Sequence, residues 1–304
     1  MTHHNTSVFK ATVIGATAVL MWSTLALFTV STGDVPPFQL LAMSFTIAFF
    51  IGLALWLKKG GGILQHLRLP GRVWLLGICG LFGYHFFYFL ALRNAPAVEA
   101  SLIAYLWPLL IVIFSALLPG ERLRWFHIVG GATGFIGAVL LVTKGQGISF
   151  DTQYGLGYLA AIICAFIWSG YSVLSRYFGA IPTDAVGGFC GATAILALFC
   201  HLLFEQTVWP QGSQWLAILL LGLGPVGAAF FTWDYGMKRG NIKALGAFSY
   251  AAPLLSTILL VIFGLAEPSW QIAVACIFIV GGAVLAAGDF FVAKPQGSKV
   301  AELQ

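Results

Sequence analysis

Charged side chains are scarce in this sequence. Of its 304 residues, 8% are charged and 60% are hydrophobic, and the mean hydropathy is +0.93. A soluble domain carries about a quarter of its residues as charged side chains, so this composition excludes a soluble globular fold. The sequence instead predicts an all-α integral membrane protein.

Long polar connections are also missing. Ten apolar stretches are each long enough to cross a bilayer, which takes roughly 20 residues. The connections between them are short, so no loop can hold the soluble catalytic or output domain of an enzyme or a sensory subunit. The predicted spans cover approximately residues 9–30, 38–57, 73–92, 95–118, 124–143, 154–177, 185–204, 214–236, 241–264 and 269–291.

Motifs for catalysis and metal binding are absent. The sequence contains no HExxH zinc motif, no GxSxG nucleophile elbow and no GxxxxGK[ST] phosphate loop. Gly288-Asp289 resembles half of an intramembrane aspartyl protease motif, but Ala286 stands where that motif needs glycine. The 5 cysteines lie inside predicted spans and lack metal-ligand spacing. We therefore expect no enzymatic activity, no cofactor, no metal and no ATP-driven step.

Basic residues are distributed unevenly across the predicted membrane. All Lys and Arg residues except Arg93 and Lys144 fall on the side that holds both termini and the even-numbered loops. The positive-inside rule then predicts cytoplasmic N- and C-termini in a multi-pass protein of the plasma (bacterial inner) membrane. The net charge of +5 is a topology signal and does not indicate nucleic-acid binding. We expect a monomer whose partners are the lipid bilayer and a small-molecule substrate.

Landmarks of the first half of the chain recur in the second half. The stretch YLWPLL at Tyr105–Leu110 recurs as YAAPLL at Tyr250–Leu255, 145 residues later. The pair Trp-Ser at Trp22 recurs at Trp168, 146 residues later. A constant offset between several landmarks is the signature of an internal repeat. The sequence therefore predicts a duplicated unit of five helices.

The two predicted repeats cover residues 1–150 and 151–304, and the second ends in a short cytoplasmic tail. Because each repeat has an odd number of spans, the second must enter the membrane from the opposite side. Inverted repeats that surround a central cavity are typical of transporters that work by alternating access. We therefore predict a transporter with ten spans in two inverted five-helix repeats.

At this point the sequence resembles a known family. The mid-span prolines, the pairs Gly120-Glu121 and Ala266-Glu267, and the glycine-rich last span resemble the drug/metabolite transporter (DMT) superfamily, EamA type. The resemblance covers nearly the whole chain. Many EamA members carry an arginine in the second span, where this chain has Ser44, so the substrates of those members are not implied. The two glutamates are expected at helix starts, where a carboxylate favours the positive helix end.

One segment narrows the resemblance further. The aromatic-rich run LFGYHFFYFLALRNAPAVEASLIAYLWPLL at residues 81–110 looks most like the YddG-type exporters of aromatic amino acids. This resemblance implies export of aromatic amino acids and of other neutral ones. The alternative within the same family is a multidrug exporter of organic cations or nucleobases. A membrane-embedded enzyme is the less favoured alternative.

Two prolines are predicted in the middle of spans. Pro108 lies about half way along the fourth span and Pro253 about half way along the ninth. A proline there removes one backbone hydrogen bond and kinks the helix, and the freed carbonyl must find a partner or line a cavity. A static kink is the simpler interpretation. Because both halves carry the proline at equivalent depth, we expect hinges beside a central cavity.

Aromatic and hydroxyl side chains concentrate in the middle of several spans. Tyrosine and tryptophan usually mark the membrane interface, but a mid-span hydroxyl needs a hydrogen-bond partner that lipid cannot offer. These residues either pack between helices or line a broad, almost uncharged cavity between spans 1, 3, 4, 6, 8 and 9, which suits flat apolar solutes. The predicted substrate-binding residues are Tyr84, His85, Tyr88, Tyr105, Trp107, Trp168, Tyr171, Ser172, Trp233 and Tyr250.

One acidic residue falls inside a predicted span. Asp234 lies near the cytoplasmic end of the eighth span, where a carboxylate could couple transport to protons. An ion pair with Lys238, four residues later on the same helix, explains Asp234 without any such role. We expect facilitated diffusion or exchange, with proton coupling at Asp234 as the alternative.

Overall fold

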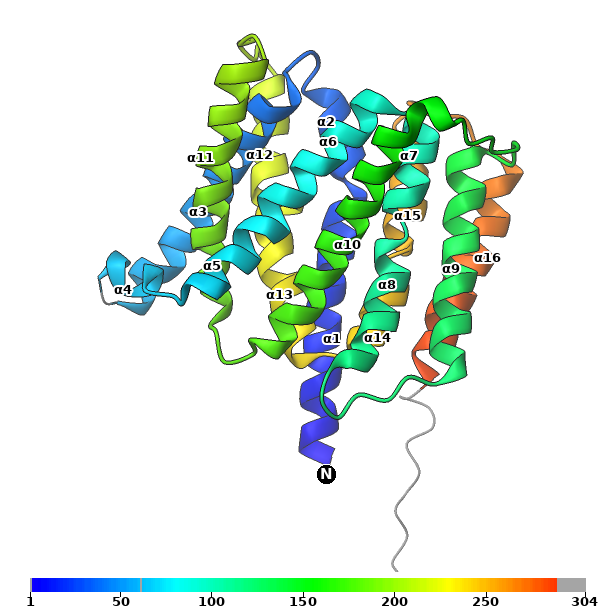
Figure 1. The fold of residues 1–304 in the computed structure, drawn as a ribbon, viewed down its shortest axis with the longest axis horizontal. Coiled ribbons are helices and arrows are strands. Elements are labelled where there is room, and N and C mark those ends of the chain that lie inside the picture. Colours follow the sequence, from blue (N-terminus) through cyan, green and yellow to red (C-terminus); the bar gives the residue numbers. More distant parts are fainter. Residues whose placement is uncertain (1, 61, 289–304) are drawn as a thin grey trace, which may run out of the picture.

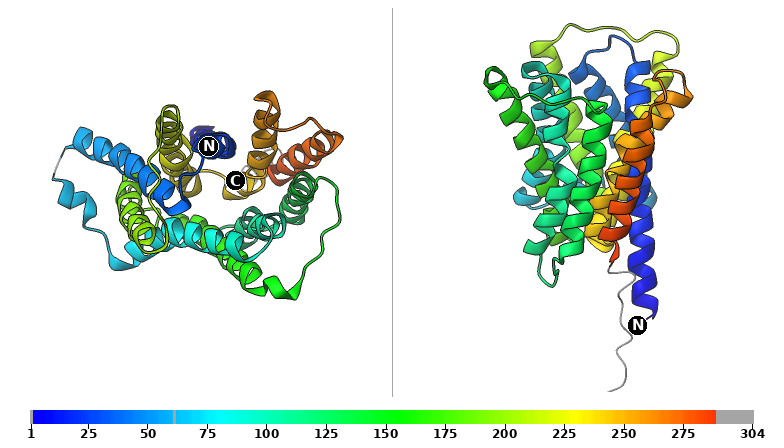
Figure 2. Two further views of the ribbon diagram at one scale, coloured as in Figure 1. Left: turned by 90° about the horizontal axis from the view of Figure 1, so that it is seen from above. Right: turned by 90° about the vertical axis from the view of Figure 1, so that its right-hand side faces the viewer.

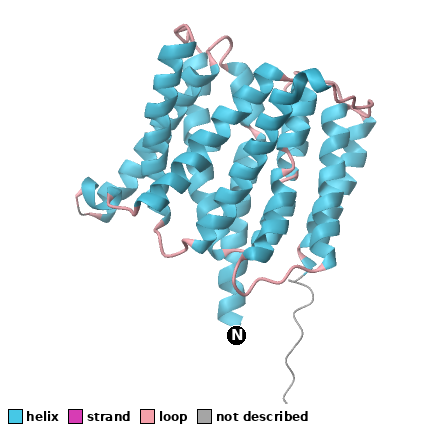
Figure 3. Cartoon of the chain, in the orientation of Figure 1, coloured by secondary structure: helices cyan, strands magenta, loops and turns pink. Residues whose placement is uncertain are grey.

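The computed structural model describes residues 2–60 and 62–288 of the chain. Every regular element in these residues is a helix, and the helices form one bundle (Figures 1 and 3). Helices suit an apolar sequence because a bilayer core offers no water to satisfy unpaired backbone groups. The predicted all-α membrane architecture is confirmed.

The long helices are interrupted at several points. In the first part of the chain the helices are α1 (Thr2–Ser23), α2 (Leu25–Ser31), α3 (Pro37–Lys59), α4 (Ile63–Leu67), α5 (Gly71–Ile78), α6 (Tyr84–Asn94), α7 (Ala97–Ala104), α8 (Trp107–Phe114) and α9 (Trp125–Thr143). In the second part they are α10 (Gly155–Tyr177), α11 (Val186–Phe204), α12 (Gln214–Leu223), α13 (Ala229–Arg239), α14 (Ile242–Phe248), α15 (Ala251–Ile262) and α16 (Trp270–Ala286).

Consecutive helices combine into membrane spans, numbered here in chain order. Within the described residues, nine segments are long and apolar enough to cross a bilayer, and α16 is a shorter apolar helix that makes the tenth span. Each segment overlaps one of the predicted spans, so the prediction of ten apolar spans is confirmed. The last predicted span extends to residue 291, and its final residues, Asp289 among them, lie outside the described part together with the predicted cytoplasmic tail.

The helix breaks fall where proline excludes a continuous helix. Span 4 is divided into α7 and α8 just before Pro108, and span 9 into α14 and α15 just before Pro253. Proline removes a backbone donor and its ring clashes with the preceding turn, which accounts for both breaks. The predicted mid-span kinks are therefore present. The two halves also share a π-helical turn at equivalent positions, Cys79–Gly83 in span 3 and Gly224–Ala228 in span 8.

The two ends of the bundle differ in which parts of the chain they hold. Helix α1 starts at the lower end in Figure 1, and α16 runs back down to the same end. The side view in Figure 2 shows the same arrangement. We call this the terminal end and the opposite one the far end. The connection between α9 and α10, residues 144–154, lies at the far end.

Helices from the two parts of the chain pack in pairs. The tightest pairs are α1 with α13, α3 with α11, α6 with α10, and α9 with α16. Three of these pairs meet through glycines, since a Cβ added at Gly52 would overlap the Cα of Gly187 on the partner helix. The same close approach joins Gly15 to Gly236 and Gly130 to Gly282. Small residues let helix backbones approach closely in a membrane, so these pairs form the rigid frame around the centre.

Candidate functional site

A pocket of about 170 Å³ lies at the centre of this frame, against the breaks in spans 4 and 9. Spans 1, 3, 4, 6, 8 and 9 contribute to its walls, and these are the six spans from which we expected a central cavity. No Asp, Glu, Lys or Arg is among its lining residues. They are Trp22, Leu25, Ala26, Tyr84, His85, Tyr105, Trp107, Trp168, Pro225, Val226, Phe230, Ala252, Pro253 and Ser256.

The pocket lies nearer the far end of the bundle. Leu25 and Ala26 belong to α2, on the far side of Trp22, and Ser256 lies one turn beyond Pro253 in the same direction. Leu25 is 41% exposed, which places this part of the wall next to the surroundings of the protein. The lining is therefore asymmetric across the membrane.

Four tryptophans meet at the base of the pocket, where Trp22, Trp107 and Trp168 line it and Trp233 packs behind them. The ring of Trp22 lies 5.0 Å from Trp233, 5.7 Å from Trp168 and 6.1 Å from Trp107, measured between ring centroids. Trp107 meets Trp168 and Trp233 edge-on, at 6.2 and 6.0 Å. Edge-to-face contacts between aromatic rings are favourable beyond the area that they bury. The base is thus a packed aromatic layer contributed by spans 1, 4, 6 and 8.

Trp22 is a pocket residue that the sequence analysis missed. Its indole Nε1 donates a hydrogen bond to the carbonyl of Pro225, 3.1 Å away, which fixes the ring against the π-helical turn of span 8. The signal was available, because Trp22 is the repeat equivalent of Trp168, a predicted site residue. Phe230, which lines the same wall, has no comparable mark in the sequence.

Tyr84 and His85 form the span 3 wall of the pocket. The Tyr84 ring lies 5.4 Å from Trp168, and the His85 ring lies 5.4 Å from Phe45. His85 Nδ1 is 2.7 Å from the carbonyl oxygen of Leu81. Because a carbonyl oxygen can only accept, Nδ1 carries the hydrogen, and Nε2 of the neutral ring is left as an acceptor. The wall therefore offers aromatic faces together with one polar ring nitrogen.

Five of the predicted site residues line the pocket and five do not. The five that line it are Tyr84, His85, Tyr105, Trp107 and Trp168. The other five are Tyr88, Tyr171, Ser172, Trp233 and Tyr250.

Four of these outer residues pack behind the pocket walls. Tyr88 stacks on Tyr84 at 6.0 Å, and Tyr171 stacks on Trp168 at 5.3 Å. Ser172 Oγ accepts a hydrogen bond of 3.0 Å from the indole Nε1 of Trp233, a residue with no exposed surface. These contacts hold the rings of the aromatic layer in place from behind.

Tyr250 forms a hydrogen bond to the backbone at the break in span 4. Its hydroxyl accepts a hydrogen bond of 3.2 Å from the backbone N–H of Leu109, the residue after Pro108. Tyr250 is fully buried, so this bond satisfies an amide that has left the helical pattern. Of the two predicted hinge prolines, Pro253 lines the pocket and Pro108 does not.

An ion network joins several spans at the terminal end. Glu121 lies in the connection after span 4, and its carboxylate is 3.0 Å from both Arg176 on α10 and Lys243 on α14. Arg176 also donates to the carbonyls of Met237 and Gly240 at the end of α13. Since these residues belong to different spans, the network ties spans 4, 6, 8 and 9 together at one end.

The predicted role of the two glutamates is wrong. Helix α9 begins at Trp125 and α16 at Trp270, and neither has an acidic residue in its first turn. Glu121 therefore stabilises no helix start, and its charge is instead balanced by two basic side chains. Glu267 is exposed and has no ion-pair partner within the described part of the chain.

Asp234 lies outside the pocket. Its carboxylate is 2.8 Å from the ammonium of Lys238, the partner expected from the spacing of four residues. The Asp234 side chain is 2% exposed, and Lys238 also donates to the carbonyl of Ile181. The pair is therefore buried at the terminal end and holds the start of span 7 against span 8.

Comparison with known proteins gives matches along most of the chain. The model of the EamA-like transporter family matches residues 9–143 and again residues 155–288. A protein of Ancylobacter novellus named aromatic amino acid exporter YddG is 60% identical over 278 residues, which cover 91% of this chain and 96% of that protein.

More distant relatives carry the same name. The aromatic amino acid exporter YddG of Escherichia coli is 26% identical over 91% of this chain and 96% of that protein. The protein of that name from Salmonella typhimurium is 28% identical over 82% of this chain and 87% of its own length. Among solved structures, one 59% identical crystal structure covers 92% of this chain and 98% of its own, with a TM-score of 0.88.

Proposed function

Because the chain belongs to the EamA-like transporter family, we propose that it exports aromatic amino acids by alternating access. The observation that carries this proposal is the central pocket, which six spans line with aromatic rings and with no charged side chain. The similarity to exporters named for aromatic amino acids supports the same substrate class. Other neutral amino acids are further candidate substrates, and we propose neither enzymatic activity nor a second subunit.

The pocket chemistry suits a ring that carries a polar end. A phenyl, phenol or indole group stacks on the faces of Trp168 and Tyr84, and each ring contact contributes about 0.5–1.5 kcal/mol. His85 Nε2 is an acceptor for the substrate's ammonium hydrogens, and the Tyr105 hydroxyl is a donor for its carboxylate. Without an arginine or lysine in the lining, phosphorylated or strongly anionic solutes are disfavoured.

Alternating access is supported by correspondences between residues 1–150 and 151–304. The proline breaks, the π-helical turns and the tryptophans Trp22 and Trp168 all recur at offsets of 145 or 146 residues. Inverted repeats with a site at their interface open to one side at a time when one element rocks against another. We propose that the breaks at Pro108 and Pro253 are the hinges of this motion.

The proposed orientation follows from the basic residues. With both termini in the cytoplasm of a bacterial cell, the pocket faces the outside, and the Glu121–Arg176–Lys243 network closes the cytoplasmic side. Cysteines introduced at Ser7 and Ser298 should react with a membrane-impermeant reagent only after the cells are opened. A cysteine at Gln146 should react in intact cells, and the reverse pattern would refute the orientation.

Counterflow in liposomes tests the proposed substrate class. The purified chain is reconstituted into vesicles loaded with unlabelled phenylalanine, and uptake of labelled phenylalanine is measured against competitors. We expect tyrosine and tryptophan to compete, and phosphorylated solutes to have no effect.

The main alternative would give a different result in the same experiment. An aromatic pocket also attracts flat cations through their interaction with ring faces. Competition by quaternary ammonium ions or purines, without competition by aromatic amino acids, would replace the proposal with multidrug or nucleobase export.

A further inference from the structure

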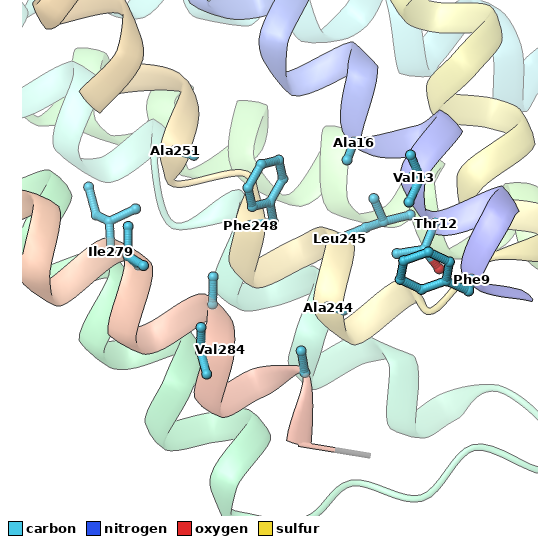
Figure 4. Close-up of a pocket in the computed structure, with 13 residues that line it drawn as sticks. Phe9, Thr12, Val13, Ala16, Ala244, Leu245, Phe248, Ala251, Ile279 and Val284 are labelled. Atoms are coloured by element: carbon cyan, nitrogen blue, oxygen red, sulfur yellow. The ribbon is translucent and has the colours of Figure 1, made fainter. Parts of the chain in front are cut away.

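A second hollow lies on the outer surface of the bundle, close to the terminal end. It is a groove of about 440 Å³ between α1, α14, the start of α15 and α16. Figure 4 shows Phe9 and Val13 projecting from α1 on one side, Val284 from α16 on the other, and Ala244 on α14 between them. The groove is separate from the central pocket, with which it shares no lining residue.

The groove is apolar along its whole length. Thr12 is the one lining residue with a polar side chain, and its hydroxyl is already used. It donates to the carbonyl of Val8 and accepts from the backbone N–H of Asn241, both at 2.8 Å. A polar ligand or an extended peptide would find no free hydrogen-bond partner here, so the groove fits a hydrocarbon.

The shape of the groove comes from small residues between larger ones. Ala16, Ala244 and Ala283 line it on three different helices, while Val13 and Val284 stand at its rims. Val13 is 48% exposed and Val284 is 56% exposed, although both lie in apolar, membrane-spanning helices. The rims therefore face the acyl chains of the bilayer, and the hollow between them is open to the same surroundings.

An exposed lysine next to the groove lining in the sequence suits an anionic head group. Lys10 is exposed and follows Phe9, the lining residue nearest the start of α1. A lysine at the end of a membrane helix reaches the level of the lipid phosphates. A lipid chain lying in the groove would thus carry its head group towards this ammonium.

We propose that the groove binds one acyl chain of an anionic phospholipid whose phosphate contacts Lys10. The bound chain lies between spans 1 and 10 and rests on α14, the half-helix that carries Lys243 into the ion network. The proposal concerns lipid binding and does not depend on which solute the central pocket carries.

Photochemical labelling tests this site. The full chain is reconstituted with a trace of phosphatidylglycerol that carries a photoactivatable group in one acyl chain, and labelled residues are mapped by mass spectrometry. We expect Val13, Val280 and Val284 to be labelled several-fold more than Leu75, which is 65% exposed on α5 and lines neither the groove nor the central pocket. Unlabelled phosphatidylglycerol should reduce labelling in the groove at a lower mole fraction than labelling at Leu75.

Two variants on one helix provide the matched comparison. Ala283→Phe fills the groove and should remove the excess labelling, whereas Ala273→Phe, on the same helix but outside the groove, should leave it unchanged. Lys10→Gln should weaken the preference for phosphatidylglycerol over phosphatidylethanolamine about fivefold, the equivalent of the roughly 1 kcal/mol that a lysine near the membrane surface contributes.

Three results would overturn the proposal. Equal labelling of the groove and Leu75 would mean that the groove holds only the lipid that surrounds any membrane protein. Labelling that persists at full strength in Ala283→Phe would place the lipid elsewhere. A disulfide-linked dimer formed efficiently by Val280→Cys would show that a second copy of the chain covers this face.

Discussion

The hydroxyl of Tyr250 accepts a hydrogen bond from the backbone N–H of Leu109, across the boundary between the two parts of the chain. Tyr105, the residue 145 positions earlier, lines the central pocket instead. The two tyrosines occupy equivalent places at the two proline breaks. Tyr250 bonds to the backbone at the break in span 4, whereas Tyr105 faces the cavity. The repeat-related breaks have therefore acquired different tasks.

Replacing these two tyrosines should separate the two tasks. Tyr250→Phe leaves the partly buried Leu109 amide without its acceptor, which costs about 1 kcal/mol. We expect a lower midpoint of thermal unfolding in detergent for Tyr250→Phe. Tyr105→Phe should leave that midpoint unchanged and lower substrate affinity, so equal thermal midpoints for the two variants would contradict the assignment.

Trp168 and Tyr88 should contribute unequally to transport. Trp168 lines the pocket, whereas Tyr88 lies behind Tyr84 and contacts it by stacking. Trp168→Ala removes a ring contact worth about 0.5–1.5 kcal/mol, so counterflow affinity should fall by roughly 2–13-fold. Tyr88→Ala should have the smaller effect, with both variants reaching the membrane in normal amounts. Equal losses of affinity in the two variants would show that Tyr88 also contacts the substrate.

Loss of the ion network should open the terminal end. Glu121→Gln removes the carboxylate that pairs with Arg176 and Lys243. The equilibrium should shift towards a conformation open at the terminal end by about 1–2 kcal/mol, or a factor of about 5–30. A cysteine at the buried Ser175 reports the opening through its labelling rate in inside-out vesicles. Glu267→Gln is the control, since Glu267 has no basic partner in the described residues. Unchanged labelling in Glu121→Gln would exclude the network as a gate.

The glycine contacts of the frame make a prediction about stability. In Gly52→Ala the added methyl overlaps the Cα of Gly187 and forces α3 and α11 apart, at a cost of about 1–3 kcal/mol. Gly170→Ala, within α10, meets no atom within 4 Å and should not lower stability. Thermal unfolding of both variants in detergent provides the comparison, and a neutral Gly52→Ala would refute the frame as described.

A pH gradient should not drive transport. Asp234 is outside the pocket and already paired with Lys238, so it is poorly placed to exchange protons with a bound solute. We therefore expect equal uptake rates in proteoliposomes with and without an imposed gradient. Strong acceleration that disappears in Asp234→Asn would establish proton coupling instead.

Periodicity and composition predicted the spans because each one depends on local sequence alone. Lipid imposes the same requirement on every span, so a run of apolar residues identifies a helix, and Pro108 and Pro253 identify its breaks. The central pocket was predictable to the extent that aromatic residues lie in the middle of spans. The position of Phe230 in the pocket wall was not, since no local signal indicated that Phe230 would contact Trp22.

Glu121 shows why the remainder could not be predicted. A carboxylate just before a span suggests a helix start, and nothing in the neighbouring sequence points to Arg176 or Lys243. Their meeting depends on how spans 4, 6 and 9 pack, and those contacts join residues 55 and more positions apart. Lys238 was predictable as the partner of Asp234 because the two share one helix.

The glycine pairs also bear on how the chain could be divided. Each pair joins a helix before residue 150 to a helix after it, whereas residues 144–154 form a largely exposed connection at the far end. The covalent link at that loop is therefore not what keeps the two parts in register. Two fragments that are translated separately and divided at this loop would still carry the three glycine contacts that join them. The exposed loop is equally suited to hold the new termini of a circularly permuted chain.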